Sequence, residues 1–161
     1  MPNQIQTLLS NLDEAYKGPA WHGPSLRAAL RGVSAKQAEQ RVKSGRHNIW
    51  ELTVHATYWK FAVRRQLQGK TRGLYNDEGR NWFQRPAKNL SQAEKEKSWQ
   101  KDQAALQREH KALREEVSKL PESKLDQHQP NSKYTPRQMI QGAAFHDTYH
   151  AGQIQLVKRL K

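Results

Sequence analysis

The C-terminal segment has the periodicity that most constrains this fold. On a helical wheel at 100° per residue, one face within roughly 80° holds Met139, Ala143, His146, His150, Ile154 and Val157. Such a face predicts an amphipathic helix that carries two histidines in its buried row. Thr135 and Pro136 mark its start as a cap followed by a proline at the first helical position. We predict that this helix continues to the C-terminus.

Apolar periodicity and capping residues predict helices along the rest of the chain. The expected ranges are about 3–17, 25–30, a turn from 34, 48–68 and 91–120. Asn48 and Glu51 have capping-box spacing, and Gly69 is expected to end that helix. Because no run of alternating β-branched residues competes with these helices, we predict an all-α four-helix bundle.

The connection between the second and third long helices is longer than an antiparallel helix pair requires. It covers about 21 residues, 70–90, and at roughly 3.3 Å per residue it can retrace the preceding helix. We therefore predict a crossover that leaves the helices at 48–68 and 91–120 roughly parallel. Trp82 and Phe83 are expected to pin this connection to the bundle, with stacking on a planar ligand as the alternative.

Composition sets limits on the domain and on the available chemistry. Hydrophobic residues make up 35% of the chain and the mean hydropathy is -1.07, which fits one domain, residues 1–161, with a thin core. The sequence contains neither a basic leader with an apolar run nor about 18 consecutive apolar residues, so we expect no export signal, no membrane association and a cytoplasmic location. The absence of cysteine excludes disulfides and thiolate ligands from the chain.

The net charge of +13 raises the question of a polyanion partner. Residues 1–80 hold 13 basic and 6 acidic side chains, and residues 81–161 hold 15 and 9, so no basic arm stands out. Most of these charges alternate in sign on the polar faces of the predicted helices. We interpret them mainly as solvated surface, and nucleic-acid binding is the less favoured alternative.

The two histidines of the last helix have the spacing of a metal-binding pair. His146 and His150 are four residues apart, which stacks them on one helix face with Cβ atoms about 6 Å apart. Trigonal or tetrahedral coordination then requires a third ligand from another helix. His55 borders the apolar stripe of the second long helix and can reach sideways to supply it. A lone histidine in such a position is otherwise a hydrogen-bonded core residue.

Three blocks of the sequence resemble the DinB/YfiT-like superfamily. They are AWHGPSLRAAL at residues 20–30, HNIWELTVHATYW at 47–59 and HDTYHAGQIQLVKRL at 146–160. The resemblance implies a four-helix bundle, commonly a homodimer, in which one histidine of the second helix and a His-x-x-x-His pair of the fourth bind zinc, nickel or a related ion. The matching positions here are His55, His146 and His150. Despite the shared label, this family is distinct from the DNA polymerase.

Three neutral imidazoles leave coordination positions open, as in catalytic zinc sites. We therefore predict a metal-dependent enzyme that acts on a small molecule, either a transferase using an external low-molecular-weight thiol or a hydrolase. The nucleophile would be metal-bound water or thiolate, with a water pKa lowered to about 7, and no catalytic side chain is assigned. The alternatives are a basic helical module with a structural metal and a metal-binding stress or storage protein without catalysis.

Four further residues are candidates for contacts around the metal or for lining a substrate cavity. Gln153 lies one turn beyond His150 and can bond to a ligand, although a role in helix packing is equally compatible. Asp147 and Glu51 are the carboxylates nearest the histidines in sequence, where either can orient an imidazole or serve as a cap or surface group. His22 is expected at the mouth of the cavity or in a structural role in its loop. His110, alone in its stripe, is expected to be a hydrogen-bonded core residue.

Overall fold

The fold is entirely helical in the computed structural model, which describes residues 3–71, 73, 75, 80–130 and 132–160. No β-strand occurs in these residues, so the all-α prediction is confirmed. None of the helices described is long and apolar enough to cross a lipid bilayer. The α-helices are α1 (Gln4–Lys17), α2 (Leu26–Ala29), α3 (Ala35–Glu39), α4 (Ile49–Leu67), α5 (Gln92–Ser118) and α6 (Pro136–Arg159), and a 3₁₀-helix covers Glu122–Lys124.

The helix ends follow the capping signals of the sequence. The Asn48 side chain accepts a hydrogen bond from the Glu51 backbone N–H at 2.8 Å, and the Glu51 carboxylate accepts one from the Asn48 N–H at 3.3 Å. The same reciprocal box opens α3, α5 and α6. After α4, Gly69 has a φ of +72°, a conformation that glycine adopts without the penalty of a Cβ atom. The 3₁₀-helix was not predicted.

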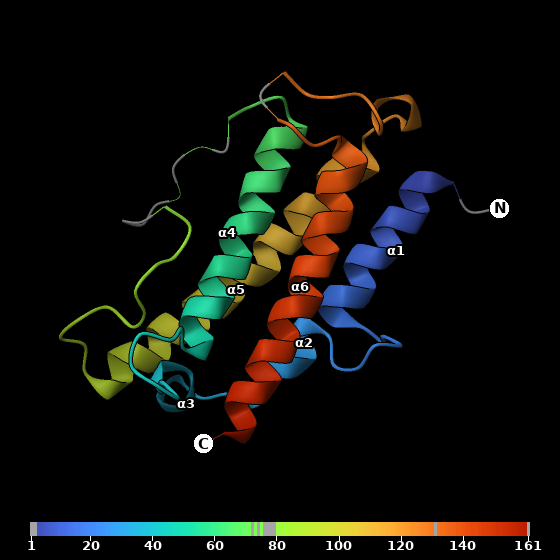
Figure 1. The fold of residues 1–161 in the computed structure, drawn as a ribbon. Coiled ribbons are helices and arrows are strands. Elements are labelled where there is room, and N and C mark those ends of the chain that lie inside the picture. Colours follow the sequence, from blue (N-terminus) through green and yellow to red (C-terminus); the bar gives the residue numbers. More distant parts are fainter. Residues whose placement is uncertain (1–2, 72, 74, 76–79, 131, 161) are drawn as a thin grey trace.

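The long helices α1, α4, α5 and α6 pack side by side (Figure 1). α4 contacts both α5 and α6, and α1 contacts the same two helices. The short helices lie at one end of this arrangement, with α2 against α6 and α1, and α3 against α4 and α5. Figure 1 shows that α4 and α5 both begin at this end and run toward the other.

The core between the helices is centred on large side chains. Trp50 and Trp99 are both buried, with ring centroids 5.3 Å apart. Their indole N–H groups remain satisfied, since Trp50 donates to Asp102 Oδ2 and Trp99 donates to the Val33 carbonyl, each at 2.7 Å. A second cluster includes Leu12, Leu113 and Ile140. Burial of one such aliphatic side chain stabilises the fold by about 1.5–3 kcal/mol.

The second half of the connection between α4 and α5 packs against α4. Residues 72, 74 and 76–79, on which part of the predicted crossover falls, lie outside the described residues. Phe83 is buried, and the Asn48 side-chain amide donates to the Arg85 carbonyl at 2.8 Å. The connection is therefore held against the beginning of α4.

Candidate metal centre

α4 and α6 bring His55, His146 and His150 together. His146 Nε2 lies 3.2 Å from His55 Nε2 and 2.9 Å from His150 Nε2. One ligand atom from each of the three residues lies within 4.8 Å of the others, a grouping that can hold a metal ion. His146 and His150 come from successive turns of α6. His55 comes from α4, and α4 packs against α6. His55 and His150 are buried, and His146 is half-buried.

Hydrogen bonds at the far side of two rings fix their tautomers. His55 Nδ1 lies 2.6 Å from the Asn81 carbonyl oxygen, and His150 Nδ1 lies 2.6 Å from Gln153 Oε1. Because carbonyl and amide oxygens only accept, each Nδ1 carries the proton and donates it. The Nε2 atoms of these rings consequently keep the lone pairs that face the centre of the group.

The electrostatic environment keeps all three imidazoles neutral. Burial lowers the pKa of His55 to about 4, although the hydrogen bond to Asn81 opposes the shift. Burial also lowers the pKa of His146 to about 3, and it lowers the pKa of His150. Neutral imidazole is the form that binds metal. At neutral pH the three rings are therefore bases with available lone pairs.

The spacing of the nitrogen atoms fits one shared cation. Metal–nitrogen bonds of about 2.0–2.1 Å at tetrahedral angles place two ligand nitrogens about 3.4 Å apart. The observed separations of 3.2 and 2.9 Å are close to that value. The Nε2 atoms of His55 and His150 both face His146 Nε2 with free lone pairs, so a cation at this point can bind all three nitrogens. The residues present therefore fit a divalent metal.

Trp82 supports the ring of His55 from the connection between α4 and α5. The two ring planes are 5° apart with centroids at 3.7 Å, and His47 stacks on the other side of Trp82 with centroids at 3.5 Å. The stack and the Asn81 hydrogen bond together hold the His55 imidazole in place. Trp82 and Phe83 thus pin the connection to α4, and Trp82 does so on a ring of the histidine group.

The four additional candidates occupy different environments. Gln153 contacts the His150 ring, as described. Glu51 caps α4 and pairs with Arg41, while its Oε2 lies 3.3 Å from His47 Nδ1. Burial raises the pKa of the Glu51 carboxyl, but the hydrogen bond and charge of Arg41 outweigh it, so the net shift is downward. Glu51 therefore stabilises the helix start instead of orienting a ring of the histidine group.

The side chains of His22 and Asp147 contact groups outside the histidine group. His22 is exposed, with its Nε2 3.5 Å from Thr148 Oγ1 on α6. Asp147 is buried and pairs with Lys60, so its hydrogen bond goes to an ammonium group and not to an imidazole. Burial raises the pKa of the Asp147 carboxyl against the opposing effect of Lys60. A carboxylate next to a metal ligand in sequence points elsewhere because neighbouring residues on a helix face different directions.

The Lys60 and Asp147 pair belongs to a polar network that crosses the core. Lys60 Nζ lies 3.4 Å from His110 Nδ1, and His110 Nε2 lies 3.1 Å from Asp13 Oδ1. Burial, followed by the charge of Lys60, lowers the pKa of His110 to about 3. His110 is therefore a hydrogen-bonded core residue, as expected, and it links α5 with α1 and α4.

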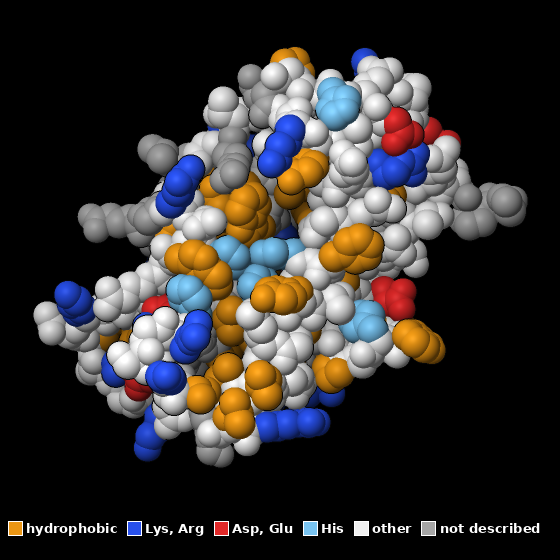
Figure 2. Space-filling view, in the orientation of Figure 1, with side chains coloured by type: hydrophobic (Ala, Val, Ile, Leu, Met, Phe, Trp, Pro, Cys, Tyr) orange, Lys and Arg blue, Asp and Glu red, His pale blue; other side chains and the backbone are white. Residues whose placement is uncertain are grey.

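An apolar cavity adjoins the histidine group. It lies between α4 and α6 and has a volume of about 320 Å³. Figure 2 shows histidine side chains gathered on this face of the molecule, bordered by hydrophobic side chains. The lining is mostly apolar but includes two amides, and it comprises Trp59, Val63, Gln66, Tyr134, Gln138, Met139, Gly142, Ala143 and His146. The sequence predicts a substrate cavity near the histidines but does not indicate these lining residues apart from His146, because they come from two helices and the loop before α6.

Comparison with known proteins identifies the family. No curated protein and no solved structure matches the chain significantly. The family model of the DinB superfamily matches residues 20–154, a span that includes the three histidines, Gln153 and the connection that contributes Asn81 and Trp82. A match over most of the chain shows membership, so the protein belongs to the DinB superfamily.

Proposed function

We propose that this protein is a metal-dependent enzyme whose cation is held by His55, His146 and His150. The observation that carries the proposal is the convergence of their Nε2 atoms, with His146 within 3.2 Å of both partners. Hydrogen bonds from the Nδ1 atoms of His55 and His150 support it, because they direct the Nε2 lone pairs inward. Three protein ligands leave room for a small molecule, as in catalytic zinc sites.

The residues of the chain have separable roles in this proposal. A divalent cation bound here supplies a Lewis acid that lowers the pKa of a coordinated water or thiol. Asn81, Trp82 and Gln153 orient the imidazoles through the contacts described. The apolar cavity beside His146 receives the hydrocarbon part of a substrate, and Gln66 and Gln138 offer hydrogen-bonding groups to its polar end.

Two reaction classes are compatible with this site. The first is transfer of an external low-molecular-weight thiol to an electrophile, which suits a chain without cysteine because the sulfur then comes from a cosubstrate. The second is hydrolysis. Zinc and nickel are the ions that we propose, since both bind imidazole nitrogen. Assaying electrophilic substrates with and without added thiol distinguishes the classes, because only the transferase requires the thiol.

Elemental analysis of the purified protein tests the metal site directly. Wild-type protein should contain close to one equivalent of zinc or nickel, whereas His55→Ala/His146→Ala/His150→Ala should contain almost none. His128→Ala is the matched control, because His128 is exposed and lies outside the histidine group. Equal metal content in wild-type protein and the triple variant refutes the proposed site. Circular dichroism of each variant checks that the helices remain folded.

We also propose that α1, α4, α5 and α6 form one four-helix-bundle domain over residues 1–161, with the α4–α5 connection as a crossover. The shared direction of α4 and α5 in Figure 1 supports this topology. A homodimer is the proposed assembly. Its support is a row of exposed apolar side chains, namely Phe145, Tyr149 and Leu156 on one face of α6 and Leu160 at its C-terminal cap. Light scattering of Phe145→Glu/Leu156→Glu should detect a monomer if this face is the interface.

A further inference from the structure

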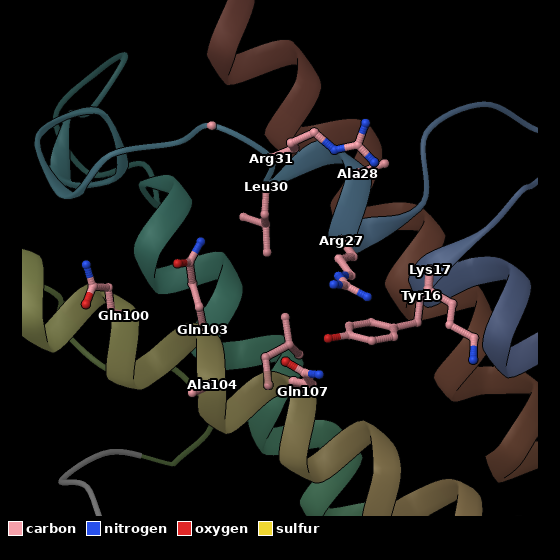
Figure 3. A pocket seen from close by; sticks show the side chains of 12 residues that line it. Tyr16, Lys17, Arg27, Ala28, Leu30, Arg31, Gln100, Gln103, Ala104 and Gln107 are labelled. Atoms are coloured by element: carbon pink, nitrogen blue, oxygen red, sulfur yellow. The ribbon is translucent and has the colours of Figure 1, made fainter.

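A second cavity lies between α1, α2 and α5, and none of its lining residues belongs to the histidine group. Its volume is about 670 Å³, within the range of small-molecule sites. Figure 3 shows Gln103 and Gln107 facing it from α5, and Arg27 and Leu30 facing it from the α2 region. Leu30 and Leu106 are buried and give the cavity an apolar floor. The cavity therefore combines apolar surface with groups that form hydrogen bonds.

The charge of this cavity has one sign. Arg27, Arg31 and Lys17 line it, and none of the described lining residues is acidic. Lys17 forms an ion pair with Asp13 at 3.6 Å, whereas neither arginine forms an ion pair with a described residue. Guanidinium groups bind carboxylate and phosphate through paired hydrogen bonds. The two arginines thus provide positive charge that the described part of the protein does not neutralise.

The hydroxyl of Tyr16 adds a neutral donor. Tyr16 is 5% exposed, its ring stacks on His110 with centroids 3.9 Å apart, and Figure 3 shows its hydroxyl directed into the cavity. The hydroxyl forms no hydrogen bond with any residue that the structure describes. Burial raises the pKa of Tyr16 to about 12, although the charge of Arg27 opposes the shift. The phenol is therefore protonated at neutral pH and able to donate.

We propose that this cavity binds a small organic anion. Its carboxylate or phosphate group is held by Arg27, with Arg31 at the rim and Tyr16 as a further donor. Its apolar part lies on Leu30 and Leu106, and the amides of Gln103 and Gln107 select polar substituents. A concave site with an apolar floor favours a compact ligand over a nucleic-acid backbone, which requires a wider row of cations.

Calorimetric titration with phenyl phosphate, benzoate and inorganic phosphate tests the proposal. Phenyl phosphate and benzoate share a ring, so the tighter ligand identifies the preferred anionic group. Inorganic phosphate should bind more weakly than phenyl phosphate, because it lacks apolar surface. Arg27→Gln/Arg31→Gln should weaken binding of the tighter ligand by roughly tenfold or more, the effect of losing a charged hydrogen bond. Failure of both aromatic anions to bind overturns the proposal.

Three variants make the result specific. Lys101→Gln/Arg108→Gln removes the same charge from exposed positions of α5 outside the cavity and should change affinity by less than about twofold. Ala104→Phe fills the cavity without a change of charge and should abolish binding of the aromatic anions. The triple histidine variant should bind them as wild type does, so this test is independent of the metal site. An equal loss of affinity for the aromatic anion in both charge variants overturns the proposal. A short DNA duplex serves as a further probe: if it binds more tightly than the aromatic anions and both charge variants weaken its binding equally, the proposal is also overturned.

Discussion

The ammonium of Lys60 and the carboxylate of Asp147 form an ion pair in which each side chain is only 1% exposed. Lys60 lies on α4 and Asp147 on α6, one residue after His146. Two charges in the interior lose their hydration, and their mutual attraction compensates only while both are present. This pair therefore connects the two helices that carry the histidine group. Each charge is tolerated in the interior only while its partner is present.

Removing one partner of this pair should be strongly destabilising. Lys60→Met leaves the Asp147 carboxylate buried without a counterion and should lower the free energy of unfolding by roughly 3–5 kcal/mol. Lys60→Met/Asp147→Leu removes both charges and should lose less stability than Lys60→Met alone. Lys97→Met, at an exposed position of α5, should change stability by less than about 0.5 kcal/mol. Urea denaturation measures all four proteins, and a Lys60→Met loss as small as that of Lys97→Met contradicts the prediction.

The stability of the metal-free protein should decrease in mild acid, in part because of His110. Its ring faces Lys60 and Asp13 and stacks on Tyr16, and burial lowers its pKa to about 3, compared with about 6.5 in an unfolded chain. Between these values the unfolded chain binds a proton that the folded protein does not. The contribution of the unprotonated His110 ring to the free energy of unfolding is therefore fully present above about pH 6.5 and is lost as the pH falls toward 3.

Replacement of this ring by a side chain that does not titrate gives the measurable change. His110→Gln should reduce the decline in unfolding free energy between pH 7 and 5 by about 2 kcal/mol. The exposed His128→Gln variant should follow the wild-type profile. Urea denaturation at several pH values in the presence of a chelator measures the decline. Parallel wild-type and His110→Gln profiles would show that His110 titrates alike in both states.

Gln153 should influence metal affinity without being a ligand. Its Oε1 accepts the proton of His150 Nδ1 at 2.6 Å and so keeps the Nε2 lone pair available. Loss of such a contact typically weakens metal binding by roughly ten- to a hundredfold, and we expect this of Gln153→Leu. Gln155→Leu changes the same residue type on the same helix, at a position that forms no hydrogen bond with the described histidines, and should bind metal as wild type does. Competition with a chromophoric chelator measures both, and equal affinities would exclude the orienting role.

Local signals explain why most helices were predictable. The caps at Ser34, Asn48, Ser91 and Thr135 act within three residues, and each opens a helix where the sequence places it. His146 and His150 were identifiable for a similar reason, since a four-residue spacing on an apolar face is visible in one helix. His55 has no periodic partner, so its assignment depended on the resemblance of its surrounding block to a family.

Contacts between distant segments were not predictable in the same way. The Asn81 carbonyl is a backbone group and leaves no mark in the amino-acid sequence, although it orients His55. Lys60 is a residue type that is rarely buried, and its partner Asp147 is 87 residues away. Both contacts depend on how α4, α6 and the connection meet in three dimensions. The sequence indicates the ligands of the site better than the groups that orient or surround them.

The apolar cavity beside His146 should be closed by a side chain at Gly142. This glycine lines the cavity within α6, and a Cβ atom added there meets no other atom within 4 Å. Gly142→Ala should therefore fold and gain about 0.8–1 kcal/mol of stability from the higher helix propensity of alanine. Gly142→Leu should extend into the cavity and weaken binding of the neutral fluorophore N-phenyl-1-naphthylamine by roughly tenfold, or about 1.4 kcal/mol.

Gly152→Leu is the matched control, because Gly152 is also a helical glycine of α6 with open space around it and lies outside the cavity. Fluorescence titration measures the affinities, and metal content should stay unchanged in both leucine variants because neither position is among the three histidines. Equal affinity of the fluorophore for Gly142→Leu and Gly152→Leu would show that it binds elsewhere, and loss of metal from Gly142→Leu would show that the substitution disturbs the histidine group itself.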